Sequence, residues 1–264
     1  MNPTDITTEI LTSKKYTNID ETVVLRITTE TIPKYTKRKD IIKAVKKELH
    51  IIHESFLPDD CHKKADTLIT NYTGTNITTD RELTLKLLPL HSSTKERIGQ
   101  VKEIYQYLNE YINTEDEILD IGCGFNPFAL PFLDNKPKTY TAYDINTATI
   151  TLLNKYFERT PSPYQALIND AATQTPKEQA DTALLFKIFP LLERQKKGRS
   201  FEILKEMNCQ LYIISFPLKS ASGKEKGMEQ FYSTQFETEL PNEFTIIDKK
   251  VFTNEMFYIL EKSL

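Results

Sequence analysis

A short segment near the middle of the chain, residues 117–127, combines an acidic residue with two closely spaced glycines. It reads Glu-Ile-Leu-Asp-Ile-Gly-Cys-Gly-Phe-Asn-Pro, and its apolar start predicts a buried parallel strand. Gly122 and Gly124 have no Cβ, so the backbone there can approach a ligand closely. Asn126 followed by Pro127 suits the first residues of a helix. A strand, a glycine turn and a helix in this order predict a binding site for a small molecule.

Two classes of cofactor use this geometry. A dinucleotide site requires Gly-x-Gly-x-x-Gly, and Pro127 occupies the third glycine position here. The order Asp-x-Gly-x-Gly, which begins at Asp120, is instead typical of S-adenosylmethionine (SAM) sites. Residues 139–145 predict a second strand that ends in an acid, Asp144, which can accept hydrogen bonds from both ribose hydroxyls in either class. A tight turn beside a chance acid is the simpler alternative.

A second polar cluster, His-Ser-Ser-Thr-Lys-Glu-Arg at residues 91–97, precedes a predicted helix. Ser93 and Glu96 fit a capping box, which gives this segment a purely structural role. The capping box does not account for His91 or Arg97. An arginine one turn into the helix can bind the carboxylate of an amino-acid-like ligand through two parallel hydrogen bonds.

From residue 117 onward, strands alternate with helices, which indicates an α/β fold with a parallel sheet. The predicted strands cover residues 117–122, 139–145, 164–169, 182–187 and 211–217, and the predicted helices cover 127–134, 146–157, 190–208 and 225–239. Residues 244–252 and 255–261 predict a terminal antiparallel hairpin. Five strands and this hairpin make the Rossmann-like seven-stranded sheet of class I methyltransferases.

The binding crevice of such a sheet lies at the carboxyl ends of its strands. Asp170 follows the third strand and is placed to meet an adenine amino group, with a helix cap or turn as its alternative role. Phe186 ends the fourth strand and suits either packing on adenine or a place in the core. The fifth strand runs into a basic loop, where the target of the reaction must approach.

Residues 1–90 predict a small helical domain. Within it, residues 40–52 place Ile41, Val45 and Leu49 on one helix face and lysines on the other. His50 and His53 lie one turn apart, but they lack a third ligand of suitable spacing, so no metal site is expected. Residues 91–113 are expected to form a connecting helix that carries part of the cofactor site, and residues 114–264 the SAM-binding domain.

Composition places this chain of 264 residues among ordinary globular proteins, with 39% hydrophobic and 27% charged residues. No run of 18 apolar residues predicts a membrane span, and the N-terminus lacks the features of a secretion signal. The three cysteines are odd in number and form no Cys-x-x-Cys pair, which argues against disulfides and zinc. We therefore expect a cytoplasmic protein.

Positive charge is concentrated in two clusters, although the formal net charge is −3. Asp40 is the one acid among the first cluster, which comprises Lys34, Lys37, Arg38, Lys39, Lys43, Lys46 and Lys47. The second cluster lies in a Gly/Ser loop and comprises Lys219, Lys224 and Lys226. A solvated face is the ordinary interpretation of such a cluster, and binding to nucleic acid is the alternative.

Together these segments resemble the aminoglycoside-resistance 16S ribosomal RNA (guanine-N7) methyltransferases. The resemblance is carried by residues 91–97, 118–127, 129–131, 142–144, 186–193, 214–220 and 222–229. The opening, at residues 10–16 and 47–50, is also similar to the family, so the resemblance covers nearly the whole chain. The segment from His50 to Tyr72 departs most from the family, with His53 and Glu54 in place of an aromatic and a small residue.

The resemblance implies that the chain uses SAM to methylate N7 of guanine 1405 in the decoding site of 16S rRNA. Such methylation blocks 4,6-disubstituted deoxystreptamine aminoglycosides. By position, the cofactor contacts of the family fall on Phe56, His91, Ser92, Ser93, Arg97, Gly122, Cys123, Gly124, Asp144, Ile145, Asp170, Ala171, Phe186 and Gln195.

The resemblance also implies that the helical domain docks on the assembled small (30S) ribosomal subunit, and we expect a monomer. The residues expected to hold the rRNA backbone are Lys34, Lys37, Arg38, Lys43, Lys46, Lys47, Lys63 and Lys64. Those expected to position the target base are Lys219, Lys224, Lys226 and Met228. Guanine N7 carries a lone pair and no proton, so orientation in a dry pocket suffices and no general base is needed. The target base is expected to flip out of its helix.

Three alternatives explain less of the sequence. A SAM-dependent methyltransferase for another acceptor also accounts for the central motifs. With a small molecule or a protein as that acceptor, the lysine clusters and the helical domain have no role, and another RNA site is the remaining possibility. A catalytically silent RNA-binding protein would be expected to have lost cofactor residues such as Asp120 and Asp144, which are present. Pro127 disfavours a dehydrogenase.

Overall fold

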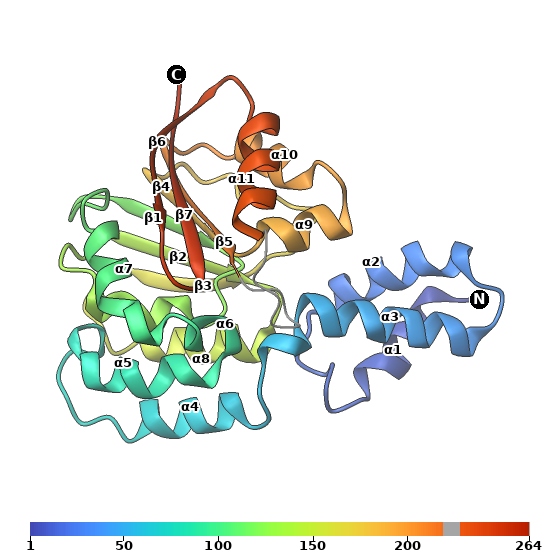
Figure 1. Cartoon of the computed structure of the whole chain (residues 1–264). Helices are drawn as coiled ribbons and strands as arrows, with labels where there is room; N and C mark the ends of the chain where they lie inside the picture. The colour runs from blue at the N-terminus through green and yellow to red at the C-terminus, as the bar shows by residue number, and fades with distance from the viewer. Residues whose placement is uncertain (219–227, 264) are drawn as a thin grey trace.

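The computed structural model of this chain describes residues 1–218 and 228–263. Its centre is a seven-stranded sheet in the order β3-β2-β1-β4-β5-β7-β6 (Figure 1). The strands are β1 (Glu117–Ile121), β2 (Thr139–Asp144), β3 (Tyr164–Ile168), β4 (Thr182–Phe186), β5 (Leu211–Pro217), β6 (Phe244–Val251) and β7 (Glu255–Lys262). The first five are parallel, and β7 lies antiparallel between β5 and β6. The α/β sheet and terminal hairpin predicted from the sequence are confirmed.

Helices precede and surround this sheet. The α-helices are α1 (Pro3–Leu11), α2 (Glu21–Thr31), α3 (Arg38–Ile52), α4 (Cys61–Thr70), α5 (Arg81–Leu87), α6 (Ser92–Lys95), α7 (Val101–Leu108), α8 (Thr147–Phe157), α9 (Phe189–Gln195), α10 (Arg199–Glu206) and α11 (Met228–Glu239). The 3-10 helices are η1 (Ile32–Lys34), η2 (Glu54–Phe56), η3 (Ile77–Thr79), η4 (Leu88–Leu90), η5 (Ile98–Gln100) and η6 (Asn126–Phe132). Within the described ranges, none of these helices is long and apolar enough to cross a membrane.

The central strands of the sheet are buried on both faces, because helices cover both sides and successive side chains of a strand point to opposite sides. Ile118 of β1 belongs to a core shared with α4, α5, α7 and α8, whereas its neighbour Leu119 belongs to a core shared with α9 and α10. Figure 1 shows α7 and α8 on one side of the sheet and α9 to α11 on the other. Burial on both faces explains why β4 and β5 are almost continuously apolar.

Helices α1 to α3 form a separate lobe, which we call the helical lobe (residues 3–52; blue in Figure 1). Its core contains Ile6, Ile10, Val24, Ile41 and Leu49, all fully buried. Helices α4 and α5 instead contribute to the core of the sheet. The change from one core to the other therefore falls between α3 and α4. That residues 1–90 act together in docking remains a prediction.

Two predicted helices differ from the observed ones for local reasons. The segment predicted as a helix over 127–134 is the 3-10 helix η6, which contains Pro131 and therefore lacks one backbone donor. The helix predicted over 190–208 is two helices, α9 and α10. Gly198 lies between them with φ of +83°, a left-handed conformation that interrupts a helix.

The predicted capping box at Ser93 and Glu96 is wrong. Helix α6 has His91 at its N-cap position and ends at Lys95, and η5 separates it from α7. Ser93 therefore lies inside a single helical turn, and the Glu96 carboxylate accepts a hydrogen bond from Lys187 instead of capping the helix. The loop lysines Lys219, Lys224 and Lys226 lie outside the described residues, and for Met228 the structure describes only its place at the start of α11.

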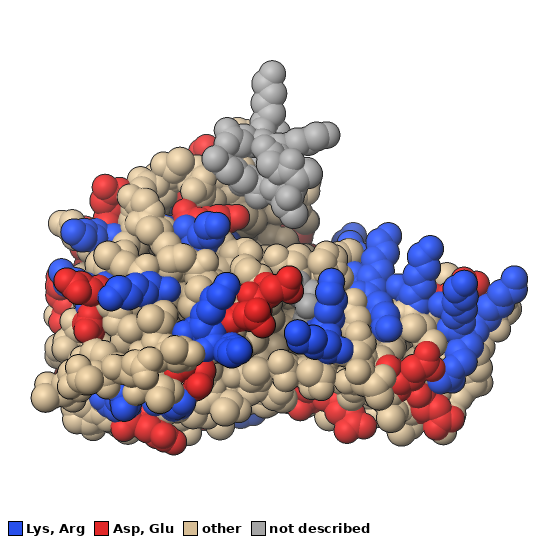
Figure 2. All heavy atoms as spheres, turned by 90° about the horizontal axis from the view of Figure 1, so that it is seen from below, with Lys and Arg blue, Asp and Glu red and all other residues tan. Residues whose placement is uncertain are grey.

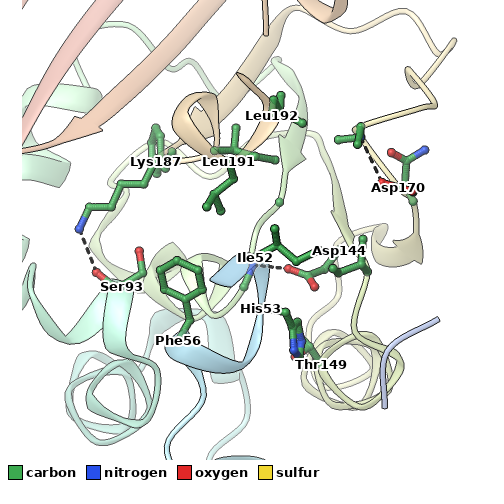
Figure 3. Close-up of a pocket in the computed structure, with 18 of the residues that line it drawn as sticks. Ile52, His53, Phe56, Ser93, Asp144, Thr149, Asp170, Lys187, Leu191 and Leu192 are labelled. Atoms are coloured by element: carbon green, nitrogen blue, oxygen red, sulfur yellow. Dashed lines mark hydrogen bonds between the residues drawn. The ribbon is translucent and has the colours of Figure 1, made fainter. Parts of the chain in front are cut away.

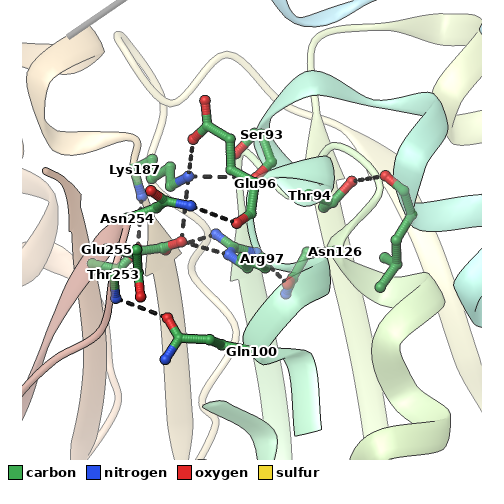
Figure 4. Close-up of polar contacts among 12 residues, drawn as sticks. Ser93, Thr94, Glu96, Arg97, Gln100, Asn126, Lys187, Thr253, Asn254 and Glu255 are labelled. Atoms are coloured by element: carbon green, nitrogen blue, oxygen red, sulfur yellow. Dashed lines mark hydrogen bonds and ion pairs between the residues drawn. The ribbon is translucent and has the colours of Figure 1, made fainter. Parts of the chain in front are cut away.

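A buried ion pair joins the segment after α6 to the last strand of the sheet (Figure 4). Arg97 donates through Nε and Nη2 to the two carboxylate oxygens of Glu255, at 2.7 and 2.8 Å. Its third nitrogen, Nη1, donates to Asn126 Oδ1 at 2.9 Å. Ser215 and Lys187 also contact the Glu255 carboxylate. The side chains of Arg97 and Glu255 are 4% and 1% exposed, so the two charges are sheltered from water.

Burial of Glu255 by itself disfavours the carboxylate. The positive charges of Arg97 and Lys187 outweigh that effect and hold the pKa of Glu255 below its ordinary value of 4.5. Removing one partner of a buried pair leaves the other charge uncompensated. The folded state therefore depends on both residues being present and ionised.

We predict that Glu255→Gln lowers the free energy of unfolding at pH 7 by about 3–5 kcal/mol, because Arg97 is left buried without its counter-charge. Since the folded pKa of Glu255 lies below 4.5, unfolding takes up a proton there as the pH falls. The stabilisation is therefore present above pH 4.5 and lost at lower pH, and the gap between wild type and variant should narrow. Urea denaturation followed by circular dichroism across this range is the measurement.

The matched control is Glu261→Gln, which changes an exposed carboxylate of the same strand, β7. It should shift the free energy of unfolding by no more than about 0.5 kcal/mol. Equal stability of the Glu255 and Glu261 variants at pH 7 would show that the buried pair does not stabilise the fold.

Candidate functional site

A cavity opens at the carboxyl ends of β1, β2, β3 and β4, between the sheet and the end of the helical lobe (Figure 3). Its wall is formed by Ile52, His53, Phe56, Leu57, His91, Ser93, Gly122, Gly124, Asp144, Ile145, Thr149, Asn169, Asp170, Ala171, Ala172, Phe186, Lys187, Ile188, Leu191, Leu192 and Gln195. Ligands of open α/β sheets bind at this edge, since loops from neighbouring strands meet there. Most residues predicted to contact the cofactor are therefore brought together.

The glycine turn after β1 forms the floor of this cavity. Gly122 and Gly124 have φ of +65° and +49°, a conformation that disfavours other residues. A Cβ on Gly122 would lie 2.4 Å from Ile188 Cδ1, and one on Gly124 would lie 3.0 Å from His91 Cε1. Both glycines thus have a backbone conformation that disfavours other residues, and a Cβ on either would press on a neighbouring side chain.

Asp144, at the end of β2, lies beside this turn (Figure 3). One carboxylate oxygen accepts the N–H of Gly124 at 2.9 Å, and the other accepts the N–H of Asn146 at 2.9 Å. These bonds fix the carboxylate against the cavity. A carboxylate oxygen can accept more than one hydrogen bond, so both oxygens of Asp144 can still accept hydrogen bonds from ligand hydroxyls.

An aromatic wall faces the turn. The rings of Phe56 and His91 are stacked with centroids 6.1 Å apart, and Phe125 lies 5.3 Å from His91. Burial lowers the pKa of His91 to about 3, with nearby positive groups adding to the effect, so its imidazole is neutral at physiological pH. His91 Nδ1 is buried and has no hydrogen-bond partner among the described residues. It is therefore suited to bond a ligand.

Asp170 lies across the cavity from Phe56 (Figure 3), and Gln195 also lines the cavity. Asp170 follows β3, and Gln195 is the last residue of α9. Both side chains bond Arg26 of the helical lobe, through Nε to Asp170 Oδ2 at 2.7 Å and through Nη2 to Gln195 Oε1 at 2.8 Å. The lobe thus reaches the cavity wall with a charged side chain as well as with the end of α3.

Lys187, directly after β4, has φ of +58°, which is unusual for a residue other than glycine. Its Nζ pairs with Glu96 at 2.7 Å and Glu255 at 3.3 Å, and its backbone N–H donates to Ser215 O at 3.0 Å. Such strained residues persist where surrounding contacts hold them, and they cluster at functional sites. The strain is located at the cavity edge.

Three of the predicted cofactor residues, Ser92, Arg97 and Cys123, are absent from the cavity wall. Arg97 lies behind the wall, with its guanidinium 4.9 Å from the centre of the Phe186 ring. Its Nε and Nη2 already donate to Glu255 and are not free for a ligand carboxylate. The motif acid Asp120 is also behind the wall, where Tyr140 and Asn126 donate to it. Burial raises the pKa of Asp120 to about 6.

Several wall residues were not anticipated from the sequence. Ile188, Leu191 and Leu192 come just after β4, so the rule that ligands bind at strand ends points to them. Ile52, His53 and Leu57 come from the end of α3 and the turn after it, and only the packing of the lobe on the sheet brings them there. No sequence signal identified them.

The chemistry of the wall fits SAM. Two glycines form a cradle that a Cβ would fill, Asp144 offers acceptors for hydroxyls, and Ile188, Leu191 and Ala171 offer apolar surface to a base. Among the described residues, no three metal-ligating side chains are grouped as an ion would require.

Figure 2 shows Lys and Arg side chains gathered along one edge of the helical lobe. In the cluster predicted to hold the rRNA backbone, Lys34, Lys37, Arg38, Lys43, Lys47, Lys63 and Lys64 are exposed. Lys46 is half-buried, with its Nζ 5.9 Å from the centre of the Tyr16 ring. Those that belong to the helical lobe form a positively charged face, interrupted by an ion pair between Arg38 and Glu9. Lys63 and Lys64 lie on α4, outside the lobe.

Comparison with known proteins extends the similarity to the whole chain. The sequence model of the ribosomal RNA methyltransferase (FmrO) family matches residues 12–259. A 16S rRNA (guanine(1405)-N(7))-methyltransferase of Serratia marcescens is 32% identical over 263 residues, covering all of both chains. An enzyme of the same name from Proteus mirabilis is 29% identical, over 98% of this chain and 96% of that enzyme.

Solved structures agree. The 16S rRNA methyltransferase RmtF, crystallised with S-adenosyl-L-homocysteine (SAH), matches with a TM-score of 0.89 and 29% identity over the full length of both chains. The 16S rRNA methylase RmtB matches with a TM-score of 0.85 and 29% identity, over 100% of this chain and 99% of that one. The family match, the full-length relatives and the sheet with its strand-end cavity lead to one conclusion. This chain belongs to the ribosomal RNA methyltransferase (FmrO) family.

Proposed function

We propose that this protein transfers a methyl group from SAM to N7 of guanine 1405 in 16S rRNA of the assembled 30S subunit. The product would confer resistance to 4,6-disubstituted deoxystreptamine aminoglycosides. The proposal rests on full-length similarity to enzymes that carry this name. A SAM-compatible cavity lies where the fold requires it. The enzyme is proposed to act as a cytoplasmic monomer, in the compartment that contains its ribosomal substrate.

The cavity wall supplies the proposed contacts to SAM. Asp144 would accept from the ribose hydroxyls, the glycine turn would hold the ligand backbone, and Asp170 would accept from the adenine amino group. The remaining proposed wall contacts are Phe56, His91, Ser93, Ile145, Ala171, Phe186 and Gln195. When bound, SAM supplies a methyl group activated by its sulfonium charge. Arg97 would act from behind the wall, by fixing Asn126 and the ring of Phe186.

The residues of the chain then have to orient and exclude water, because guanine N7 has no proton to remove. His91 is neutral and buried, so it adds no positive charge to compete with the sulfonium. The apolar side chains around the cavity keep water away from the reacting atoms. The basic loop with Lys219, Lys224 and Lys226, together with Met228, is proposed to position the flipped base.

The helical lobe is proposed to dock on the subunit through its positively charged face. Rows of exposed lysines recognise the regular phosphate backbone without reading bases. The lobe also borders the cavity, so docking and cofactor binding use neighbouring surfaces.

We predict that purified protein methylates intact 30S subunits and not free 16S rRNA, since docking requires the folded subunit. The measurement is transfer of label from methyl-labelled SAM, followed by primer extension to locate the modified base. Modification at another nucleotide, or transfer to a non-RNA acceptor, would assign a different substrate to this enzyme.

We predict that Asp144→Ala weakens SAM binding about 10- to 150-fold, because hydrogen bonds to a charged acceptor contribute about 1.5–3 kcal/mol. Isothermal titration calorimetry measures the dissociation constant. Asp134→Ala is the control, because it removes an exposed acid outside the cavity. Wild-type affinity in the Asp144 variant would refute the assignment of this cavity to the cofactor.

We predict that the double substitution Lys43→Glu with Lys47→Glu weakens binding to 30S subunits and leaves SAM affinity unchanged. The slope of log affinity against log salt is negative, and each lost phosphate contact should reduce its magnitude by about 1. The control is Lys102→Glu with Lys205→Glu, two exposed lysines on helices of the sheet domain. Filter binding at several salt concentrations separates the two cases, and equal slopes for both double variants would contradict docking through the lobe.

A further inference from the structure

Arg26 lies on α2 of the helical lobe and reaches across to the sheet domain. Its side chain is 15% exposed. Nε donates to Asp170 Oδ2 at 2.7 Å, Nη2 donates to Asp170 Oδ1 at 3.3 Å, and Nη2 also donates to Gln195 Oε1 at 2.8 Å. One guanidinium thus holds two residues of the cavity wall.

Those two residues come from separate elements. Asp170 follows β3, and Gln195 ends α9. Among the described residues, no hydrogen bond joins Asp170 to Gln195 directly, and Arg26 connects them. Asp170 Oδ1 also accepts the N–H of Ala172 at 3.2 Å, and Gln195 Nε2 donates to Leu191 O at 3.3 Å. With Arg26 in place, both side chains are held from two directions.

The lobe meets the sheet close to this point in other ways. The N–H of Asp20 donates to Ile145 O at 2.9 Å, and the N–H of Thr147 donates to Asn18 O at 2.7 Å. Ile145 lines the cavity and also packs against the core of the lobe. Helix α2 carries Arg26, and the residues just before this helix are therefore anchored to the loop that follows Asp144.

We propose that Arg26 is a positioning residue for the adenine end of the cofactor site. Its fork holds the Asp170 carboxylate in the orientation that accepts from the adenine amino group, and it fixes the Gln195 amide beside that carboxylate. A planar guanidinium can bond both groups at fixed angles, which the single ammonium of a lysine cannot do. The inference rests on the proposed assignment of this cavity to SAM.

A second ion pair between lobe and sheet domain provides a matched control. Arg194 of α9 donates to both carboxylate oxygens of Glu48 on α3, at 3.0 and 2.8 Å. Neither residue lines the cavity. Arg194→Ala therefore removes a contact of the same kind across the same junction, without touching the wall.

The experiment compares Arg26→Ala, Arg26→Lys and Arg194→Ala with wild type by isothermal titration calorimetry. The two ligands are SAH and S-inosyl-L-homocysteine, in which an oxygen replaces the adenine amino group. Arg26→Ala should lose about 5- to 30-fold in affinity for SAH, less than the full loss of a charged hydrogen bond because Asp170 itself remains, and change less than about twofold for the inosyl ligand. Arg26→Lys, the milder change should the alanine variant fail to fold, should lose about 3- to 10-fold for SAH alone.

Arg194→Ala should bind both ligands as wild type does. In methyl transfer, Arg26→Ala should raise KM for SAM and leave kcat nearly unchanged, since the lost interaction is made equally in the ground and transition states. Equal losses for both ligands, or an unchanged preference for SAH in the Arg26 variants, would overturn the proposal.

The Asp144→Ala variant distinguishes a wrong role for Arg26 from a wrong assignment of the cavity. If it loses SAH affinity while both Arg26 variants retain it, the cavity binds the cofactor and only the role of Arg26 is wrong. If wild type fails to bind SAH, or if Asp144→Ala binds it normally, the cavity assignment and the role of Arg26 are both overturned.

Discussion

The buried pair of Arg97 and Glu255 is the interaction on which the arrangement of the site most depends. It joins the segment after α6 to the last strand of the sheet, across 158 positions of sequence. Removing two charges from water is costly, and good geometry with further hydrogen bonds is what offsets that cost. Asn126, Ser215 and Lys187 provide those further contacts. Because Asn126 follows the glycine turn and Lys187 follows β4, one ionic cluster fixes two sides of the cavity.

The helical lobe has two physical roles in this arrangement. Its outer face carries exposed lysines, whose attraction to phosphate acts over a distance set by salt. Its inner face closes the cavity through the end of α3 and through Arg26. The lobe carries the proposed docking surface and also lines the cofactor site, so it connects the two over a short distance. The methyl transfer itself needs no acid or base from the chain, so the placement of cofactor and target base matters more than reactive side chains.

Much of the fold was predictable, because parallel strands buried on both faces leave a strong apolar pattern and glycine turns limit what can follow. The strands, the terminal hairpin and the positions of Gly122, Gly124, Asp144 and Asp170 at strand ends were all predicted correctly. Local helix boundaries were less predictable. Pro131 and Gly198 altered two helices, and Ser93 resembled a cap in sequence while lying inside a helical turn in space.

The sequence by itself determined the sheet, the cofactor turn and the family, since these depend on local residue types and their spacing. Only the tertiary structure decided what each polar side chain contacts. Arg97 suited a ligand carboxylate by sequence, but Glu255 takes that place because the last strand returns beside it. Arg26 showed no motif, and His53 and Leu57 lay in the segment least like the family, yet packing of the lobe brings all three to the site. Contacts between residues far apart in sequence depend on how whole elements pack, which local patterns do not encode.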